Sequence, residues 1–335
     1  MAVEVEGVRK PPAAGGPFGG WWRSVSRAPE FKRLGVLVAV LALFGFLNPR
    51  FLGVESFVAI LQATAFVGIV AIGQTMLIVA GEFDLSVGSV AALSSVSAAL
   101  LMTTSGLDPF VAMAIGIVIG ALVGLVNSIL VLKVAIPSFI ATIGMLFVVR
   151  GLTVYISHAR PIYPLPPVVH SLGDVKLAGI SVSIVIFLSL VVVCAFILNR
   201  TTFGRLIRAT GGNPEAARIA GVRTVRTKVM LFVFVGILAS FAGILSIMYF
   251  GSGTSTTGTG WELSAIAAVV VGGTSLFGGS GTVVGTFLGL LILQSIANGM
   301  VAAQIDPWWQ TITIGVIMLF SVSVDLIRRR TRPIA

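Results

Sequence analysis

Ten long apolar runs, separated by short polar segments, dominate this sequence of 335 residues. A membrane-spanning helix needs about 20 mostly apolar residues, and most of the runs approach that length. Charged residues make up only 10% of the chain, against about 25% in a soluble domain. A fold surrounded only by water cannot hide this much apolar surface, so the lipid bilayer must be part of the solvent. The runs cover residues 34–48, 57–80, 87–104, 110–132, 137–157, 180–198, 229–250, 262–274, 281–299 and 309–327.

The pattern predicts an all-α membrane protein with about ten transmembrane helices, some of them short or broken. The eighth run is short enough to be a half-helix or a re-entrant segment. We expect a disordered basic tail at residues 1–33, a transmembrane domain at 34–327 and a second basic tail at 328–335. The composition excludes a cytosolic enzyme, a nucleic-acid-binding domain and a secreted binding domain.

Basic residues are divided unevenly among the segments that connect the runs. Residues 1–33, the loop 199–228, the C-terminal tail and the turn at Lys133 together contain 18 of the 22 Lys and Arg residues. Cytoplasmic segments of membrane proteins carry an excess of Lys and Arg, and an even number of spans places all four segments on one side. We therefore expect both termini and the loop 199–228 in the cytoplasm. The Pro-rich segment 158–178 would lie outside, as a cap over the outer mouth.

The two halves of the chain contain matching signals in the same order. Residues 81–86 read Gly-Glu-Phe-Asp-Leu-Ser, and residues 260–264 read Gly-Trp-Glu-Leu-Ser. Each half also contains three glycines spaced by four, which line one helix face and let a neighbouring backbone approach closely. Five spans per half is an odd number, so the signals predict two inverted repeats, an arrangement typical of transporters. Glycine is also frequent in membrane helices, so the glycines alone would not establish a repeat. They are Gly116, Gly120 and Gly124 in one half, and Gly281, Gly285 and Gly289 in the other.

The loop 199–228 contains the sequence of a short capped helix. Asn213 is a good N-cap, and Pro214 suits the first helical position. Glu215 complements the helix dipole near its start, and Gly221 ends the helix as the residue after the C-cap. We interpret this helix of about two turns as a docking element for a partner; the alternative is a solvated basic loop. Its small residues, which suit close contact with a groove, are Ala216, Ala217 and Ala220.

Four ionisable residues lie in or beside the apolar runs, where charge is costly and usually functional. Arg150 lies about 20 Å along its run, counting 1.5 Å per residue. An Arg in a span needs a carboxylate, and Asp84 is the best candidate, provided that a broken span brings its segment to mid-membrane. We expect both residues, with Glu82 and Glu262, in or beside a transport path. The alternative is an ion pair that only joins helices.

No motif for catalysis, a cofactor or a metal is present. The Gly-rich segment 272–281 lacks the Lys of a phosphate-binding loop, and a tight break between a half-helix and the next span explains it better. A single cysteine, Cys194, excludes a disulfide framework and a thiolate metal site. Two histidines, His158 and His170, are too few for a His-based cluster.

Three segments resemble one known family. Residues 81–89, Gly-Glu-Phe-Asp-Leu-Ser-Val-Gly-Ser, resemble the G-G-x-D-L-S-V-G-S segment of ribose-type ABC importer permeases. Residues 137–142 with Arg150, and the loop 204–221, are similar to the same family. The similarity runs from about residue 35 to residue 327. Glu82 departs from the pattern, because the family more often has Gly there.

The resemblance implies a permease in the bacterial plasma (inner) membrane that imports a monosaccharide, ribose-like or related, by alternating access. It implies a permease homodimer or heterodimer, two cytoplasmic ATP-hydrolysing ABC subunits and an extracytoplasmic sugar-binding protein. This chain would catalyse no chemistry itself. A branched-chain amino-acid or autoinducer permease of the same fold is one alternative. An ion-driven secondary transporter is another, although such a carrier has no ATPase for a docking helix to bind.

Overall fold

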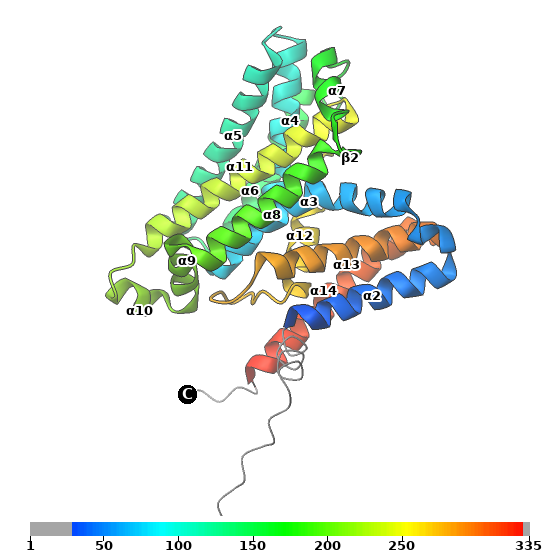
Figure 1. The fold of residues 1–335 in the computed structure, drawn as a ribbon. Coiled ribbons are helices and arrows are strands. Elements are labelled where there is room, and N and C mark those ends of the chain that lie inside the picture. Colours follow the sequence, from blue (N-terminus) through cyan, green and yellow to red (C-terminus); the bar gives the residue numbers. More distant parts are fainter. Residues whose placement is uncertain (1–28, 331–335) are drawn as a thin grey trace, which may run out of the picture.

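The computed structural model describes residues 29–330, and the predictions for the two tails lie largely outside them. The described chain is mostly helical, with one antiparallel pair of short strands (Figure 1). The elements are α2 (Pro29–Leu47), η1 (Pro49–Leu52), α3 (Val54–Val79), α4 (Val87–Thr103), α5 (Pro109–Leu132), α6 (Ser138–Ser157), α7 (Pro167–Gly173), β1 (Lys176–Leu177), β2 (Ile180–Ser181), α8 (Val182–Arg200), α9 (Thr202–Gly212), α10 (Pro214–Ile219), α11 (Thr224–Phe250), α12 (Trp261–Val271), α13 (Val283–Ala302) and α14 (Pro307–Arg330).

Each predicted apolar run corresponds to a helix, so the prediction of an all-α membrane protein is confirmed. Six helices are long and apolar enough to cross a bilayer, namely α3, α5, α6, α8, α11 and α13. Three shorter apolar helices are α4, α12 and the stretch Trp308–Ser323 of α14. With 11 residues, α12 has about half the length of a spanning helix. The first helix starts earlier than predicted, because α2 begins at Pro29, inside the expected tail.

The glycines of the first triplet lie where two helices approach most closely. A Cβ at Gly120 of α5 would collide with Ser240 and the backbone of Gly236 in α11, and one at Gly236 would collide with Gly120. In the second half, Gly285 and Gly289 of α13 contact the backbone of Gly272 and Ala268 in the same way. Close backbone approach between membrane helices requires such small residues. Gly281 precedes α13, which begins at Val283, so its predicted place within the helix was wrong.

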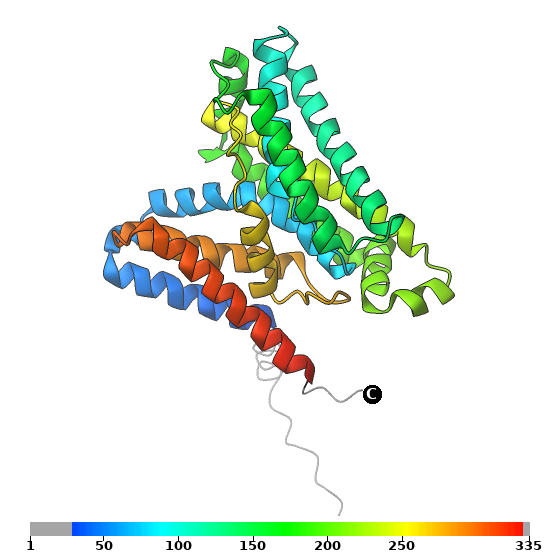
Figure 2. The same cartoon turned by 180° about the vertical axis from the view of Figure 1, so that it is seen from behind.

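The helix contacts of one half have counterparts in the other. α5 packs against α4 and α11, and α13 packs against α12 and α3. α12 lies near the centre of the molecule, in contact with α3, α13 and α14 (Figures 1 and 2). This central position brings the start of α12 and the loop before it beside α3.

Two of the segments that connect helices, here called breaks, contain the matching sequence signals, and both include glycines with positive φ. The first break comprises residues 80–86, between α3 and α4, and the second comprises residues 251–260, between α11 and α12. Gly81 in the first has φ 85°, and Gly251, Gly258 and Gly260 in the second also have positive φ. Glycine adopts this conformation without steric cost. The glycines therefore let the chain turn sharply at both places.

Candidate functional site

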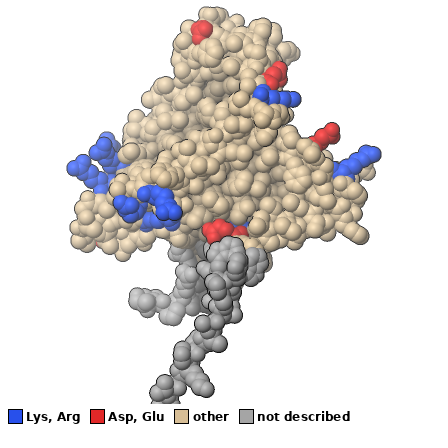
Figure 3. Space-filling view, viewed as in Figure 1, with Lys and Arg blue, Asp and Glu red and all other residues tan. Residues whose placement is uncertain are grey.

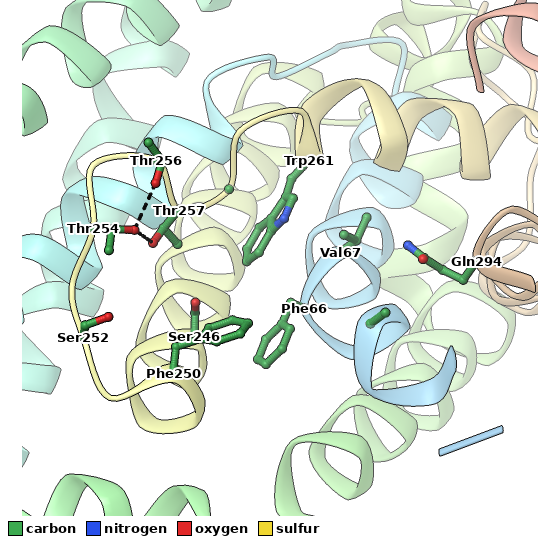
Figure 4. Close-up of a pocket in the computed structure, with 12 residues that line it drawn as sticks. Phe66, Val67, Ser246, Phe250, Ser252, Thr254, Thr256, Thr257, Trp261 and Gln294 are labelled. Atoms are coloured by element: carbon green, nitrogen blue, oxygen red, sulfur yellow. Dashed lines mark hydrogen bonds between the residues drawn. The ribbon is translucent and has the colours of Figure 1, made fainter. Parts of the chain in front are cut away.

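A cavity of about 640 Å³ lies among α3, the end of α11, the second break, the start of α12 and α13. Figure 4 shows the aromatic side chains of its wall facing hydroxyl-bearing residues of the second break. None of the described residues that line the cavity is charged. The lining residues are Ala63, Phe66, Val67, Ser246, Phe250, Ser252, Thr254, Thr256, Thr257, Gly258, Trp261 and Gln294.

Three aromatic rings from three helices form one side of the cavity. Phe66 of α3 and Trp261 of α12 are stacked, with ring centroids 6.2 Å apart and planes 7° apart. Phe250, at the end of α11, lies 5.9 Å from Phe66 and is 63% exposed. Such rings combine a large apolar area with a face of negative quadrupole. They provide a platform for the flat, C–H-rich side of a ligand.

Hydroxyl groups of the second break form the facing side. The Oγ1 atoms of Thr254 and Thr257 lie 3.0 Å apart, and Thr256 Oγ1 donates to Thr254 Oγ1 at 3.3 Å (Figure 4). Ser252 and Gln294 add a hydroxyl and an amide from other directions. Each hydroxyl is both a donor and an acceptor, and the amide offers both functions. The cavity therefore suits a neutral ligand that carries many hydroxyls.

Arg150 does not pair with Asp84, so that prediction was wrong. The Nη1 atom of Arg150 donates to the backbone carbonyls of Ser255 and Thr257, the latter at 2.9 Å. These carbonyls belong to the second break, beside the cavity. Two carbonyls thus take the place of the predicted carboxylate partner, and the carboxylate of Asp84 is bonded to Ser86 and Asn127.

Asp84 is buried in a network that fixes the first break. Its Oδ1 accepts from the backbone N and the Oγ of Ser86 at 2.8 and 2.6 Å. Its Oδ2 accepts from Asn127 Nδ2 of α5 at 3.1 Å, and its carbonyl accepts from Gln74 Nε2 of α3. Asp84 does not line the cavity, and these bonds join α3, α5 and the turn before α4. Its partners are all uncharged groups, so the described residues show it joining helices by hydrogen bonds and not through the ion pair of the alternative.

The other two predicted acids also have local partners. Glu82 forms an ion pair of 2.6 Å with Lys228 at the start of α11, and both side chains are mostly buried. Glu82 thus lies away from the cavity, joined to the segment 199–228. Glu262 lies in the first turn of α12, where its Oε1 accepts from Gly260 N at 3.3 Å. It adjoins the cavity through Trp261 without lining it.

The capped helix predicted in the loop 199–228 is present as α10. Asn213 Oδ1 accepts from Ala216 N at 3.0 Å, and Pro214 is the first helical residue. Glu215 pairs with Arg218 at 2.8 Å on the exposed surface. Gly221 follows the C-cap with φ 83°, as predicted. The sequence reading missed α9, which precedes α10 and contacts it.

The burial of the α10 side chains corrects the prediction that all three alanines of this segment contact a partner. Ala217 is only 5% exposed, so it is buried in this chain and cannot present a knob to a partner. The helical period places Ala216 on the exposed side, with Ala220 exposed just after the helix. Ile219 is 80% exposed. The free face of α10 therefore has an apolar residue that the sequence reading overlooked.

A cluster of glycines connects α9 to the ends of two other helices. A Cβ at Gly211 of α9 would collide with the carbonyl of Val79, the last residue of α3. Gly279, in the loop before α13, donates its N–H to the same carbonyl at 2.8 Å. Gly278 lies against the backbone of both Gly211 and Gly81. These contacts therefore join α9 to the end of α3 and to this loop, backbone against backbone.

A family model described as "Branched-chain amino acid transport system / permease component" matches residues 56–322. The chain belongs to this family. Within the permease, the matched region runs from the start of α3 into α14. It contains the cavity, both breaks and the segment 199–228.

Curated relatives cover nearly the whole permease. The ribose import permease protein RbsC of Escherichia coli K12 is 35% identical over 300 residues, which cover 88% of this chain and 93% of the relative. The L-arabinose ABC transporter permease protein AraH of Azospirillum brasilense is 34% identical over 317 residues, 94% of this chain and 91% of the relative. The autoinducer 2 import system permease protein LsrC of Enterobacter sp. strain 638 is 34% identical over 297 residues, 88% of this chain and 86% of the relative. No solved structure matches the chain.

The sequence reading missed most of the cavity of the permease. Phe66 and Gln294 lie within long apolar helices, where one aromatic or amide residue gives no signal of its own. The Gly-, Ser- and Thr-rich stretch before Trp261 was the available signal. It departs from the composition of both neighbouring helices, and it contains most of the hydroxyls at the cavity.

Proposed function

We propose that this chain is the membrane-spanning permease subunit of an ABC importer that translocates a monosaccharide, ribose-like or related. The observation that carries the proposal is the uncharged cavity with an aromatic wall facing hydroxyls. A sugar ring presents C–H groups that pack on aromatic faces and hydroxyls that bond to Ser, Thr and Gln. The relatives named for ribose and L-arabinose import support this substrate class.

The lining also favours a sugar over a branched-chain amino acid, although the family description names the latter. An amino acid brings an ammonium and a carboxylate, and a buried charge without a partner is strongly unfavourable. No charged side chain lines the described cavity, and Arg150 is bonded to carbonyls. Autoinducer 2 is a second candidate, because a relative with that printed name is 34% identical. Family membership leaves no support for the ion-driven alternative.

The partners follow from the same assignment. Cytoplasmic ATP-hydrolysing subunits bind the exposed face of α10, and closure of these subunits displaces α9 and the glycine cluster. ATP hydrolysis occurs on those subunits, and this chain contributes binding and movement only. The coupling residues are then Asn213, Pro214, Glu215, Ala216 and Gly221, with Ile219 added and Ala217 removed because its side chain is buried.

The arrangement in the membrane is part of the proposal. The permease lies in the bacterial plasma membrane, with both termini and residues 199–228 in the cytoplasm. The cap, residues 158–178, lies outside, where a sugar-binding protein delivers its ligand. The gathering of Lys and Arg over the end that carries α9 and α10 supports this orientation (Figure 3). A second permease, identical or related, completes the translocation path.

We also propose ten spans in two inverted repeats. Exchanging α3 with α11, α4 with α12 and α5 with α13 converts the pair α5–α11 into α13–α3. It also converts α4–α5 into α12–α13, and all four pairs are in contact. Such exchange is what a repeat related by a pseudo-twofold axis produces. The path then lies where the two halves meet, which is where the cavity is.

Uptake by the reconstituted importer tests the proposed function. The permease, its ATP-hydrolysing subunits and its binding protein would be placed in proteoliposomes, and uptake of labelled ribose, L-arabinose, autoinducer 2 and leucine compared. We expect ATP-dependent uptake of a sugar and none of leucine. Trp261→Ala should lower uptake about tenfold, because it removes a stacked ring from the wall. Trp308→Ala is the matched control, because Trp308 is 79% exposed on α14. Leucine uptake would overturn the substrate class.

A further inference from the structure

The second break, residues 251–260, carries most of the hydroxyls of the cavity but has no regular structure of its own. Its internal backbone bonds are turns, such as Thr257 N to the Thr254 carbonyl and Thr259 N to the Thr256 carbonyl, both 3.2 Å. Turns of this kind shape the loop without fixing where it lies. We call this segment the pocket loop. Its place at the cavity must come from the elements packed around it.

Arg150 of α6 bonds to the middle of the pocket loop. Its Nη1 donates to the carbonyls of Ser255 and Thr257, two residues apart, and the guanidinium is half-buried. The Thr254, Thr256 and Thr257 side chains line the cavity. The arginine therefore bonds to the backbone of a loop whose side chains form the wall. Hydrogen bonds from a charged donor are stronger than those between neutral groups.

The cap bonds to the pocket loop at a second point. Ile162 N donates to the Gly253 carbonyl at 2.9 Å, and Gly253 N donates to the Ile162 carbonyl at 3.1 Å. Ile162 lies in the segment that directly follows α6, which ends at Ser157. One continuous stretch of chain thus bonds to the loop at residues 253, 255 and 257.

On another side the pocket loop lies directly on α4. A Cβ at Gly253 would stand 2.8 Å from the Ala99 Cβ and 3.0 Å from the Ser95 carbonyl oxygen. A Cβ at Gly258 would stand 3.0 Å from the Cα of Gly88. These contacts limit how far the loop can move toward α4. These contacts do not prevent the loop from moving away from α4. The bonds from α6 and the cap must limit that movement.

We propose that Arg150 is a positioning residue that keeps the hydroxyls of the pocket loop in the wall of the cavity. It acts through the backbone of the loop and does not contact the transported molecule. Without its bonds, residues 254–257 move away from α6 while the contacts with α4 at both ends remain. The proposal rests on the proposed function only for the identity of what enters the cavity.

The mobility of the loop gives a test that needs no substrate. A Thr254→Cys variant in purified, detergent-solubilised permease places a partly buried thiol on the loop, which a reagent reaches faster when the loop moves outward, and the native Cys194 is buried. Its rate of reaction with a maleimide would be measured alone and with Arg150→Met, Arg150→Lys or Arg160→Met. Arg160 is exposed on the cap and serves as the matched control.

We expect Arg150→Met, which removes two hydrogen bonds from a charged donor, to raise the labelling rate by at least about tenfold. Arg150→Lys, which keeps one charged donor, should give a smaller rise, and Arg160→Met none. An unchanged rate in Arg150→Met, or an equal rise in Arg160→Met, would overturn the proposal. The Lys variant keeps the test valid if the Met variant does not fold.

Transport separates this proposal from the proposed function. In the reconstituted importer, sugar uptake should fall about tenfold in Arg150→Met, fall less in Arg150→Lys and stay normal in Arg160→Met. If no sugar is transported by the native chain but the labelling pattern appears, the proposed function fails and the positioning role stands. If sugar is transported normally by Arg150→Met, the positioning role fails alone.

Discussion

The two breaks of this permease share a sequence pattern but are stabilised in different ways. The first, residues 80–86, contains its own bonding centre, because the buried Asp84 bonds to Ser86 in the same turn and to Asn127 of α5. The second, residues 251–260, is fixed from outside, by Arg150 of α6 and Ile162 of the cap. The matching residues also fall at different places, because α4 begins after the Leu-Ser pair and α12 begins before it.

This difference suggests different tasks for the two breaks. The first break contacts the segment 199–228 through the ion pair of Glu82 with Lys228 and through Gly81 in the glycine cluster. A rigid turn suits a place where force is transmitted. The second break borders the cavity, where a loop that depends on its neighbours can change position when they move. Mutations in and around both breaks test this contrast, from the largest expected effect to the smallest.

Loss of Asp84 should cost the most stability. Asp84→Ala leaves the buried N–H and hydroxyl of Ser86 without their acceptor and removes one of the two acceptors of Asn127 Nδ2, which lowers the free energy of unfolding by about 3 kcal/mol. Asp108→Ala removes an exposed N-cap bond to Phe110 N and should cost about 1 kcal/mol. Thermal unfolding in detergent would compare the two. Equal losses would contradict the fixed character of the first break.

A methyl group at the glycine cluster should uncouple sugar uptake from ATP hydrolysis. Gly211→Ala collides with the Val79 carbonyl, whereas Gly212→Ala stands 3.8 Å from Gly279 Cα, an ordinary contact. Overpacking of this kind costs about 1–3 kcal/mol. We therefore expect uptake per ATP hydrolysed to fall about tenfold in Gly211→Ala. Uptake and ATPase activity would be measured together in proteoliposomes. A similar defect in Gly212→Ala would mean that the close backbone contact is not the cause.

Hydroxyls of the second break should affect transport without affecting stability. Thr257→Val keeps the backbone carbonyl that Arg150 binds but removes a hydroxyl from the cavity. Loss of one hydrogen bond of about 1 kcal/mol lowers sugar uptake about fivefold, and the unfolding temperature should stay nearly constant. Thr259→Val is the matched control in the same loop, because Thr259 does not line the cavity. A lower unfolding temperature in Thr257→Val would show that this break is as rigid as the first.

The sequence predicted the helices well because bilayer thickness sets the length of a spanning helix. The length of each apolar run therefore indicates the length of its helix. The capped helix α10 was also predictable, since Asn213, Pro214 and Gly221 act on backbone within a few residues of themselves. The buried side of α10 was not, because burial of Ala217 depends on how the segment packs against the rest of the chain.

The partners of the charged residues could not be predicted from the sequence either, because they too depend on how the chain packs. Asp84 and Arg150 were paired on charge alone, but Asn127 and Ser86 supply donors to the acid, and backbone carbonyls satisfy the arginine. Every residue has a backbone carbonyl, so a sequence does not indicate which carbonyls will bond to an arginine. Lys228 lies 146 positions from Glu82, and nothing between them signals the contact. Only the fold brings such groups together.

The smallest effect concerns the ion pair that joins the first break to α11. Glu82 and Lys228 lie 2.6 Å apart with side chains 12% and 17% exposed, whereas the pair of Glu215 and Arg218 is 68% and 71% exposed. Exposed pairs contribute about 0–1 kcal/mol, and a less exposed pair is less screened by solvent and salt. A double-mutant cycle of Glu82→Gln and Lys228→Met should give about 1 kcal/mol of interaction free energy. The cycle of Glu215→Gln and Arg218→Met should give clearly less. If the two cycles agree, Glu82 does not connect the first break to α11 more strongly than a surface pair would. Coupling would then pass through the glycine cluster alone.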